Sequence, residues 1–283
     1  MTLGAQTTSG RISSDLGGEA GRLMSTNASP SAIKAEHRRS AGAAGDVDYR
    51  IVGRDMQFVE IELDPGESAI AEAGALMFKD TAVAMDAIFG DGPKTNSSFL
   101  SKVAAAGRRL VTGESLFLTL FTHQGLGKAR VAFAAPYPGS ILPFKLSSFG
   151  GALIAQSDAF LCATNGVTVG IHLQHKVMTR LFGREGFIMQ RLEGEGWVFI
   201  HVSGSLVERG LADGEELHVD MGCIAAMTPT IDLDIIRAGS VKSPSLGREG
   251  MFLAHIKGPG RLWLQSHPLS RLSGRVVPAD GDG

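Results

Sequence analysis

The sequence predicts an all-β protein built from three similar units, and three observations support this. The segment FGREGFIMQRLEGEG (182–196) recurs 64 residues later as LGREGMFLAHIKGPG (246–260). The chain holds 37 glycines without collagen periodicity, which indicates many tight turns and suits short strands. The apolar runs near these repeats are about seven residues long and bounded by glycine, which is too short for core helices. Together these features favour a β-sandwich or barrel with pseudo-threefold symmetry.

The repeat extends well beyond the two quoted segments. A shift of 64 residues aligns Gly150 with Gly214 and Gly194 with Gly258 without a gap. A third, looser copy lies upstream, in GESAIAEAGALMF and TGESLFLTLFTHQGLGKARVAF. The predicted organisation is a disordered N-terminal tail (1–47), one β domain of three units (48–146, 147–209 and 210–272) and a flexible C-terminal tail (273–283).

Each unit is expected to contain two hairpins. In the second unit, AFLCATNGVTVGI (159–171) predicts one hairpin that turns at Asn165 and Gly166. The next hairpin is predicted to join GFIMQRL (186–192) to WVFIHV (197–202) through a Gly-x-Gly turn. A single hairpin is only marginally stable in water, so the three units are expected to share a core. In the first unit, SSFLSKVAAAGRRLV (97–111) predicts a short helix within a loop.

The bulk composition restricts the class of protein and its compartment. Two cysteines, Cys162 and Cys223, exclude a disulfide-framed scaffold and are expected to be small core residues in a reducing compartment. No apolar run approaches the roughly 18 residues of a membrane span, and residues 1–47 lack the apolar stretch of a secretory signal. We therefore expect a cytoplasmic protein, peripheral to the inner membrane if it binds lipid, or a mitochondrial protein if the source is eukaryotic.

The sequence contains no catalytic or metal-binding signature, so we expect neither an enzyme nor a cofactor. It lacks a Gly-x-Ser-x-Gly elbow, a Cys-x-x-Cys pair and a His-Glu-x-x-His helix. His172 and His175 have a spacing that zinc sites use, but no third ligand type is near them, and loop residues are the simpler interpretation. One glutamate recurs at the same corner of each unit, which is typical of a structural role; these are Glu114, Glu185 and Glu249.

A variable loop in each unit carries local positive charge. The loops span 88–112, 171–184 and 235–248, and together they hold ten basic residues and the single acid Asp91. The rest of the chain has 17 basic and 28 acidic residues, because the whole chain has 27 and 29. Threefold pseudo-symmetry would place the three loops at one end of the protein. The candidate anion-binding residues are Lys102, Arg108, Arg109, Lys176, Arg180, Arg184, Arg237, Lys242 and Arg248.

Several long motifs give the chain a resemblance to a known family. DMQFVEIELDPGESAIAEAGALMF, DAFLCATNGVTVGI, GREGFIMQRLEGEG and GPGRLWLQSHPLSRL occur in order between Asp48 and Leu272. In these motifs the chain resembles the altered-inheritance-of-mitochondria family, member twenty-four, a mitochondrial biogenesis family with many bacterial members. The resemblance implies three units similar to the tryptophan RNA-binding attenuation protein, in a double-stranded β-helix type of fold. It implies no reaction.

Three functions remain open at this point. The leading hypothesis is a non-enzymatic binding or scaffold protein whose basic loops dock on an anionic membrane or on an acidic protein partner, since apolar and basic residues together suit anionic lipid. The second is RNA binding, by analogy with the attenuation protein, although aromatic residues are only 6% of the chain. The third is a small-molecule site inside the β body. A homo-oligomer is also expected, because strands such as SLFLTLF are apolar on both faces; the alternative is that the units cover each other within one chain.

Overall fold

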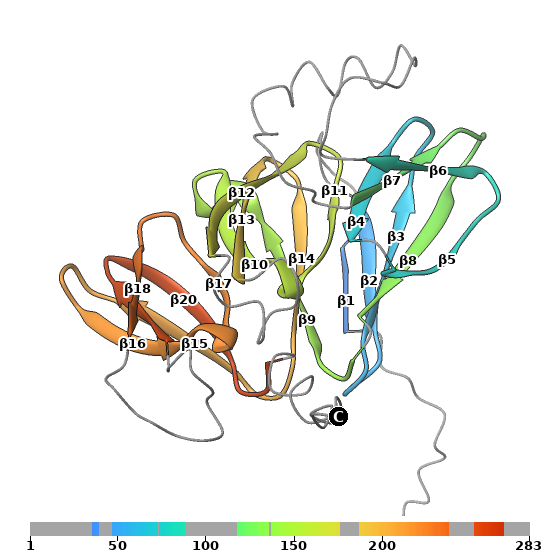
Figure 1. The fold of residues 1–283 in the computed structure, drawn as a ribbon. Helices are drawn as coiled ribbons and strands as arrows, with labels where there is room; N and C mark the ends of the chain where they lie inside the picture. The colour runs from blue at the N-terminus through green and yellow to red at the C-terminus, as the bar shows by residue number, and fades with distance from the viewer. Residues whose placement is uncertain are drawn as a thin grey trace, which may run out of the picture. The chain divides into compact units, whose positions relative to one another are not determined.

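The computed structural model describes residues 36–39, 47–72, 74–88, 118–135, 137–175, 187–237 and 252–268. These residues form antiparallel β-sheets joined by turns and short 3-10 helices, which confirms the all-β class (Figure 1). The described strands make four open sheets, and none of these sheets closes into a barrel. The predicted helix at 97–111 lies outside the described residues.

Twenty strands are described, and they fall into three consecutive segments. The first contains β1 (Glu36–Arg39), β2 (Asp48–Val52), β3 (Phe58–Leu63), β4 (Ser68–Glu72), β5 (Leu76–Lys79), β6 (Val83–Ile88), β7 (Leu118–His123) and β8 (Ala129–Ala134). The second contains β9 (Ser140–Lys145), β10 (Ala152–Gln156), β11 (Phe160–Thr164), β12 (Val167–His175), β13 (Phe187–Gly194) and β14 (Trp197–Val202). The third contains β15 (Leu206–Leu211), β16 (Glu216–Asp220), β17 (Ile224–Met227), β18 (Asp232–Arg237), β19 (Phe252–Lys257) and β20 (Gly260–Gln265).

The strand order of each sheet shows how the segments are joined. Sheet 1 has the order β1-β2-β3-β8-β5, and sheet 2 has the order β6-β7-β4-β11-β14-β9. Sheet 3 has the order β12-β13-β10-β17-β20-β15, and sheet 4 has the order β16-β19-β18. Sheets 2 and 3 therefore each take three strands from one segment and three from the next, so neighbouring segments are joined by backbone hydrogen bonds.

The chain turns where the glycines predict, but the predicted hairpin partners are wrong. β11 and β12 flank the turn at Asn165 and Gly166, yet β11 pairs with β14 and β4, whereas β12 pairs with β13. Likewise β13 and β14, expected to pair with each other, belong to sheets 3 and 2. At each of these tight turns the chain crosses from one sheet to the next. The apolar faces of the two sheets can then pack against each other, which a flat hairpin does not allow.

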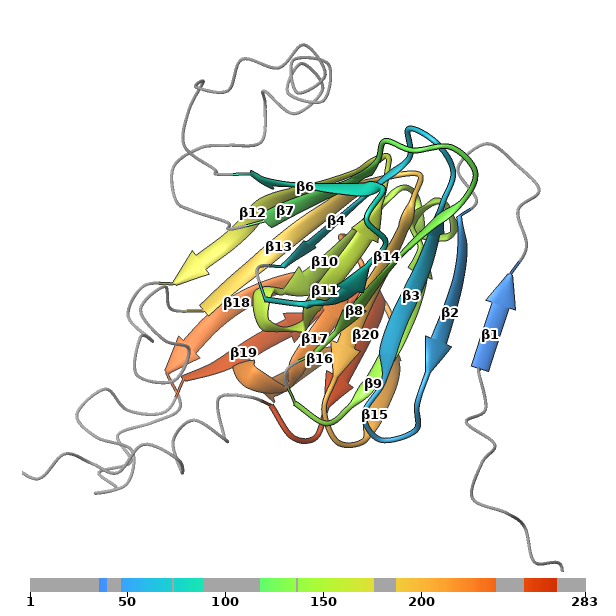
Figure 2. The ribbon, with the colours of Figure 1, turned by 90° about the vertical axis from the view of Figure 1, so that its right-hand side faces the viewer.

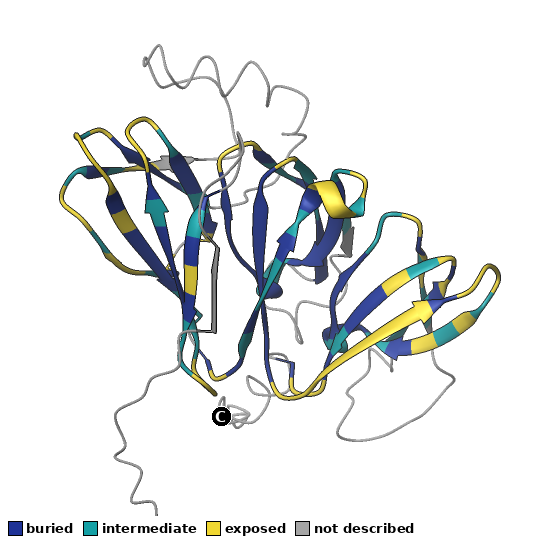
Figure 3. Cartoon of the chain, turned by 180° about the vertical axis from the view of Figure 1, so that it is seen from behind, coloured by how far each residue is buried: buried dark blue, intermediate teal, exposed yellow. Residues whose placement is uncertain are grey.

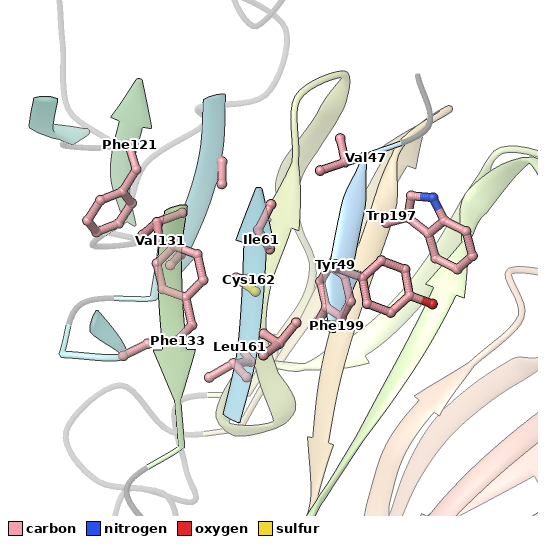
Figure 4. Packing of buried hydrophobic residues seen from close by; sticks show 14 of the residues in the cluster. Val47, Tyr49, Ile61, Phe121, Val131, Phe133, Leu161, Cys162, Trp197 and Phe199 are labelled. Atoms are coloured by element: carbon pink, nitrogen blue, oxygen red, sulfur yellow. The ribbon is translucent and has the colours of Figure 1, made fainter. Parts of the chain in front are cut away.

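Three apolar cores lie between successive sheets. The first core joins residues of sheets 1 and 2, such as Ile61 and Phe121. The second joins residues of sheets 2 and 3, such as Phe160 and Leu153, and the third joins Met189 of sheet 3 to Ile256 of sheet 4. Figure 3 shows the buried residues concentrated along the strands and the exposed ones mostly at the turns; strand β15 is an exception, since all but its last residue are exposed. In Figure 4, Tyr49 of β2 lies against Trp197 and Phe199 of β14, with ring centroids 5.1 and 4.9 Å apart.

Two local features differ from the expectations. Residues Glu36–Arg39, which fall within the predicted disordered tail, form β1 and pair with β2. The described helices are all single 3-10 turns: η1 (Leu146–Phe149), η2 (Ser157–Ala159) and η4 (Met221–Cys223).

Candidate functional site

Three long hairpins carry the predicted basic loops. β6 pairs with β7, β12 with β13 and β18 with β19, so each variable loop joins two paired strands. In Figure 2 the ends of β6, β12 and β18 all lie on the left of the view, and we call this the loop-bearing side. Within each hairpin the loop leaves from one end, because the strand before the loop runs antiparallel to the strand after it.

The predicted anion-binding residues themselves are outside the described residues, with one exception. Arg237 is the last residue of β18, and only its backbone is described. The structure therefore describes the strands from which the loops leave, and gives no position for the other candidate side chains, which are Lys102, Arg108, Arg109, Lys176, Arg180, Arg184, Lys242 and Arg248. The recurrent glutamates Glu114, Glu185 and Glu249 also lie outside the described ranges.

The cations on the described sheets are mostly paired with carboxylates. On sheet 1, the Arg50 guanidinium lies 2.8 Å from the Glu60 carboxylate, and this pairing raises the pKa of Arg50. Lys128 Nζ lies 2.7 Å from Glu62, and its hydrogen bond is the main cause that lowers the pKa of Glu62. The other paired cations are Arg130, Arg191, Arg209, Lys257 and Arg261. These sheets therefore neutralise much of their own positive charge.

Three of these paired cations lie away from the loops, in or near the turns that follow β7, β15 and β19. Lys128 directly precedes β8, after the β7–β8 turn; Lys257 ends β19; and Arg209, on β15, lies 3.5 Å from Glu215 in the β15–β16 turn. They provide a natural comparison for the loop cations, because they have the same charge and a different position.

The sequence did not single out one buried titratable group, His201 on β14. Its side chain is 2% exposed, and neither ring nitrogen has a hydrogen-bond partner among the described residues. The ring lies edge-on to Tyr137, with centroids 4.7 Å apart, and the Tyr137 hydroxyl donates to the Asp158 carbonyl over 2.7 Å. Burial lowers the pKa of His201 to about 4. A lone histidine in an apolar strand gives no sequence signal, so only the fold shows its burial.

This histidine predicts a specific loss of stability in acid. The folded protein keeps His201 neutral, whereas the unfolded chain protonates it below its ordinary pKa of about 6.5. The free energy of unfolding is therefore unaffected by this group above pH 6.5 and decreases as the pH falls toward 4. At pH 4 the decrease is about 3 kcal/mol. We expect urea unfolding curves to show this loss in the wild type, and a shallower pH dependence in His201→Gln between pH 7 and pH 4. Equal pH dependence in the two proteins would contradict the assignment.

The described residues form no metal-binding cluster. No group of three or more His, Cys, Asp or Glu side chains in the described part is arranged to hold a metal ion. The interpretation of His172 and His175 as loop residues is wrong, because both belong to strand β12. Partial desolvation lowers the pKa of His172, and the nearby Arg191 lowers it further. Cys162 is fully buried in the first core, where burial raises the pKa of its thiol. Cys223 is half-buried in η4.

No helix in the described ranges is both long enough and apolar enough to cross a bilayer.

Comparisons with known proteins agree with this architecture. The model of the family described as "Mitochondrial biogenesis AIM24" matches residues 49–267. An uncharacterised protein of Streptococcus pyogenes serotype M6 is 29% identical over 237 residues, which cover 81% of this chain and 91% of that protein. A crystal structure of a Streptococcus pyogenes protein superposes with a TM-score of 0.62 at 23% identity, over 81% of this chain and 97% of the other. The last likeness shows the fold alone.

Proposed function

Because the chain belongs to the mitochondrial biogenesis AIM24 family, in which the matched relative is uncharacterised, we propose a function from the chain's own surface. We propose that it is a non-enzymatic membrane-docking protein whose loop-bearing side binds anionic lipid head groups. One observation supports this most directly: β6, β12 and β18, the strands that precede the three basic loops, all end on the same side of the protein (Figure 2).

The charge distribution supports the same proposal. The loops hold ten of the 27 basic residues and one of the 29 acidic residues, so their charge is opposite to that of the remaining chain. Described cations such as Lys128 and Arg261 are already paired with carboxylates, which weakens their attraction for an external anion. An anionic bilayer would therefore be attracted by the loops and repelled by the acidic remainder, which orients the protein on the surface.

Charge removal in the first loop tests this proposal. Each basic residue near an anionic membrane contributes about 1 kcal/mol, so the triple variant Lys102→Gln, Arg108→Gln and Arg109→Gln is expected to bind about 100-fold more weakly. Binding is measured by sedimentation with phosphatidylglycerol vesicles at low salt, with phosphatidylcholine vesicles for comparison.

The matched control removes the same charge from the side away from the loops. Lys128→Gln, Arg209→Gln and Lys257→Gln break exposed ion pairs, which contribute little to stability, and this variant is expected to bind like the wild type. Equal weakening in both variants would indicate nonspecific attraction and contradict the proposed orientation. If the wild type showed no preference for anionic vesicles but retained single-stranded RNA in a salt-sensitive manner, the RNA alternative would replace the proposal.

A further inference from the structure

The three segments pair their strands by one common scheme. β3, β9 and β15 pair with β8, β14 and β20, which in turn pair with β5, β11 and β17. β4, β10 and β16 pair with β7, β13 and β19, which in turn pair with β6, β12 and β18. The details agree as well: the register shift between Phe160 and Cys162 in β11 recurs between Ile224 and Ala226 in β17. The strands can therefore be compared position by position.

Neighbouring segments are joined by one kind of strand pair, formed twice in the same register. β4 pairs with β11, with Ala71 opposite Cys162, and β10 pairs with β17, with Ala155 opposite Ala226. Ala71 and Ala155 occupy equivalent positions in their segments, and so do Cys162 and Ala226. The junction is thus the same in both places.

The same junction is left open at both ends of the described body. β5 is equivalent to β11 and β17, but it is the edge of sheet 1; β16 is equivalent to β4 and β10, but it is the edge of sheet 4. The other edges differ in kind, because β6, β12 and β18 are edges in every segment, as are β9 and β15. Among the described strands, only β5 and β16 lack a partner that their counterparts have.

The open β5 edge has apolar side chains where an unpartnered edge normally carries charge. Met77 and Phe78 are 54% and 40% exposed, whereas the equivalent strands β11 and β17 are buried throughout. Lys79 could protect the edge, but its Nζ donates to the Val83 carbonyl over 2.7 Å, toward the neighbouring strand. An exposed apolar edge strand without outward charge or proline is a template for pairing with another strand.

We infer that β16 of one molecule pairs with β5 of a second copy of this chain. The two open sheets would then merge into β18-β19-β16-β5-β8-β3, which is the strand order that sheets 2 and 3 already have within one chain. The common register places Val219 opposite Phe78 of the second copy, and His218 opposite Lys79 of the second copy. The two surfaces are different, so copies would join head to tail, in a ring or an open chain according to the angle between them.

The mass of the full-length chain in solution tests the inference directly. Light scattering after size exclusion is expected to give at least twice the 29.8 kDa of one chain, and Phe78→Asp is expected to reduce this to one chain. The matched control is Val207→Asp on β15, an edge strand that the proposed contact leaves free. Val207 is 47% exposed, and the substitution adds the same charge there. It is expected to keep the mass of the wild type.

A cysteine pair tests the register and does not depend on the charge variants. Directly opposite residues of an antiparallel pair have Cβ atoms about 4.5–5.5 Å apart, so a small shift of the strands brings them to the roughly 4 Å that a disulfide requires. Mild oxidation of Lys79→Cys combined with His218→Cys is expected to give disulfide-linked multimers on a non-reducing gel, and Lys79→Cys combined with Arg209→Cys is expected to stay largely single. The inference is overturned if the wild type has the mass of one chain at all concentrations tested, if Phe78→Asp and Val207→Asp behave alike, or if both cysteine pairs cross-link equally. If another part of the same chain covered β5, the wild type would have the mass of one chain, which is the first of these outcomes.

Discussion

Phe199→Ala is expected to lower the free energy of unfolding by about 3–5 kcal/mol. Phe199 is fully buried on β14 in sheet 2, and its ring lies 4.9 Å from the ring of Tyr49 on β2 in sheet 1. Removing the ring leaves a cavity between two sheets, and the surrounding strands are held by ladders on both sides: β14 by β11 and β9. The backbone therefore has little freedom to collapse into the space.

Equilibrium urea unfolding, followed by tryptophan fluorescence, measures this effect. A suitable control is Val207→Ala on β15, where the side chain is about half exposed and the expected change is within about 0.5 kcal/mol. A loss below about 1 kcal/mol for Phe199→Ala would show that sheets 1 and 2 do not pack through this ring.

Gly194→Ala is expected to destabilise the protein by about 3 kcal/mol or more. Gly194 ends β13 with a φ of 137°, a conformation that residues with a side chain rarely adopt. A Cβ atom there would lie 1.8 Å from the Gly166 carbonyl oxygen of the facing turn, so the backbone would have to move. The Gly194 amide also donates to the Gly151 carbonyl over 2.9 Å, and the movement would disturb this bond.

The chain offers a matched glycine for comparison. Gly210 on β15 has open space where a Cβ would lie, so Gly210→Ala is expected to be neutral or slightly stabilising. Thermal unfolding of the two variants is the measurement. Similar melting temperatures for Gly194→Ala and Gly210→Ala would contradict the close approach of the turn at Gly166.

The sequence predicted where the chain turns better than it predicted which strands pair. The glycine at 166 marks a real turn between β11 and β12, because turn residues act through local backbone preferences. Whether the next strand stays in the same sheet or crosses to the facing one depends on contacts distant in the sequence, such as β11 with β4 and β14. Local patterns carry no information about those contacts, so the hairpin partners were wrong although the all-β class was confirmed.

In the candidate site, too, local features were predictable from the sequence and long-range contacts were not. Charge composition identified basic loops such as 235–248, since a cluster of like charges is visible in any linear window. The burial of His201 and the exposure of Phe78 were not predictable, because one apolar strand looks much like another until its neighbours are known. The open junction is defined by the β4–β11 and β10–β17 ladders, which no local sequence pattern predicts.

These ladders also affect how the molecule loses its structure. Sheets 2 and 3 each combine strands from two segments. Excising the second segment, 140–202, would therefore leave β4 and β17 of the flanking segments without their partners β11 and β10. The sequence repeats thus do not mark boundaries at which the polypeptide can be divided into autonomous fragments. Denaturation is expected to spread from any one segment to its neighbours as a concerted event, as in arrays whose interfaces contribute much of the stability.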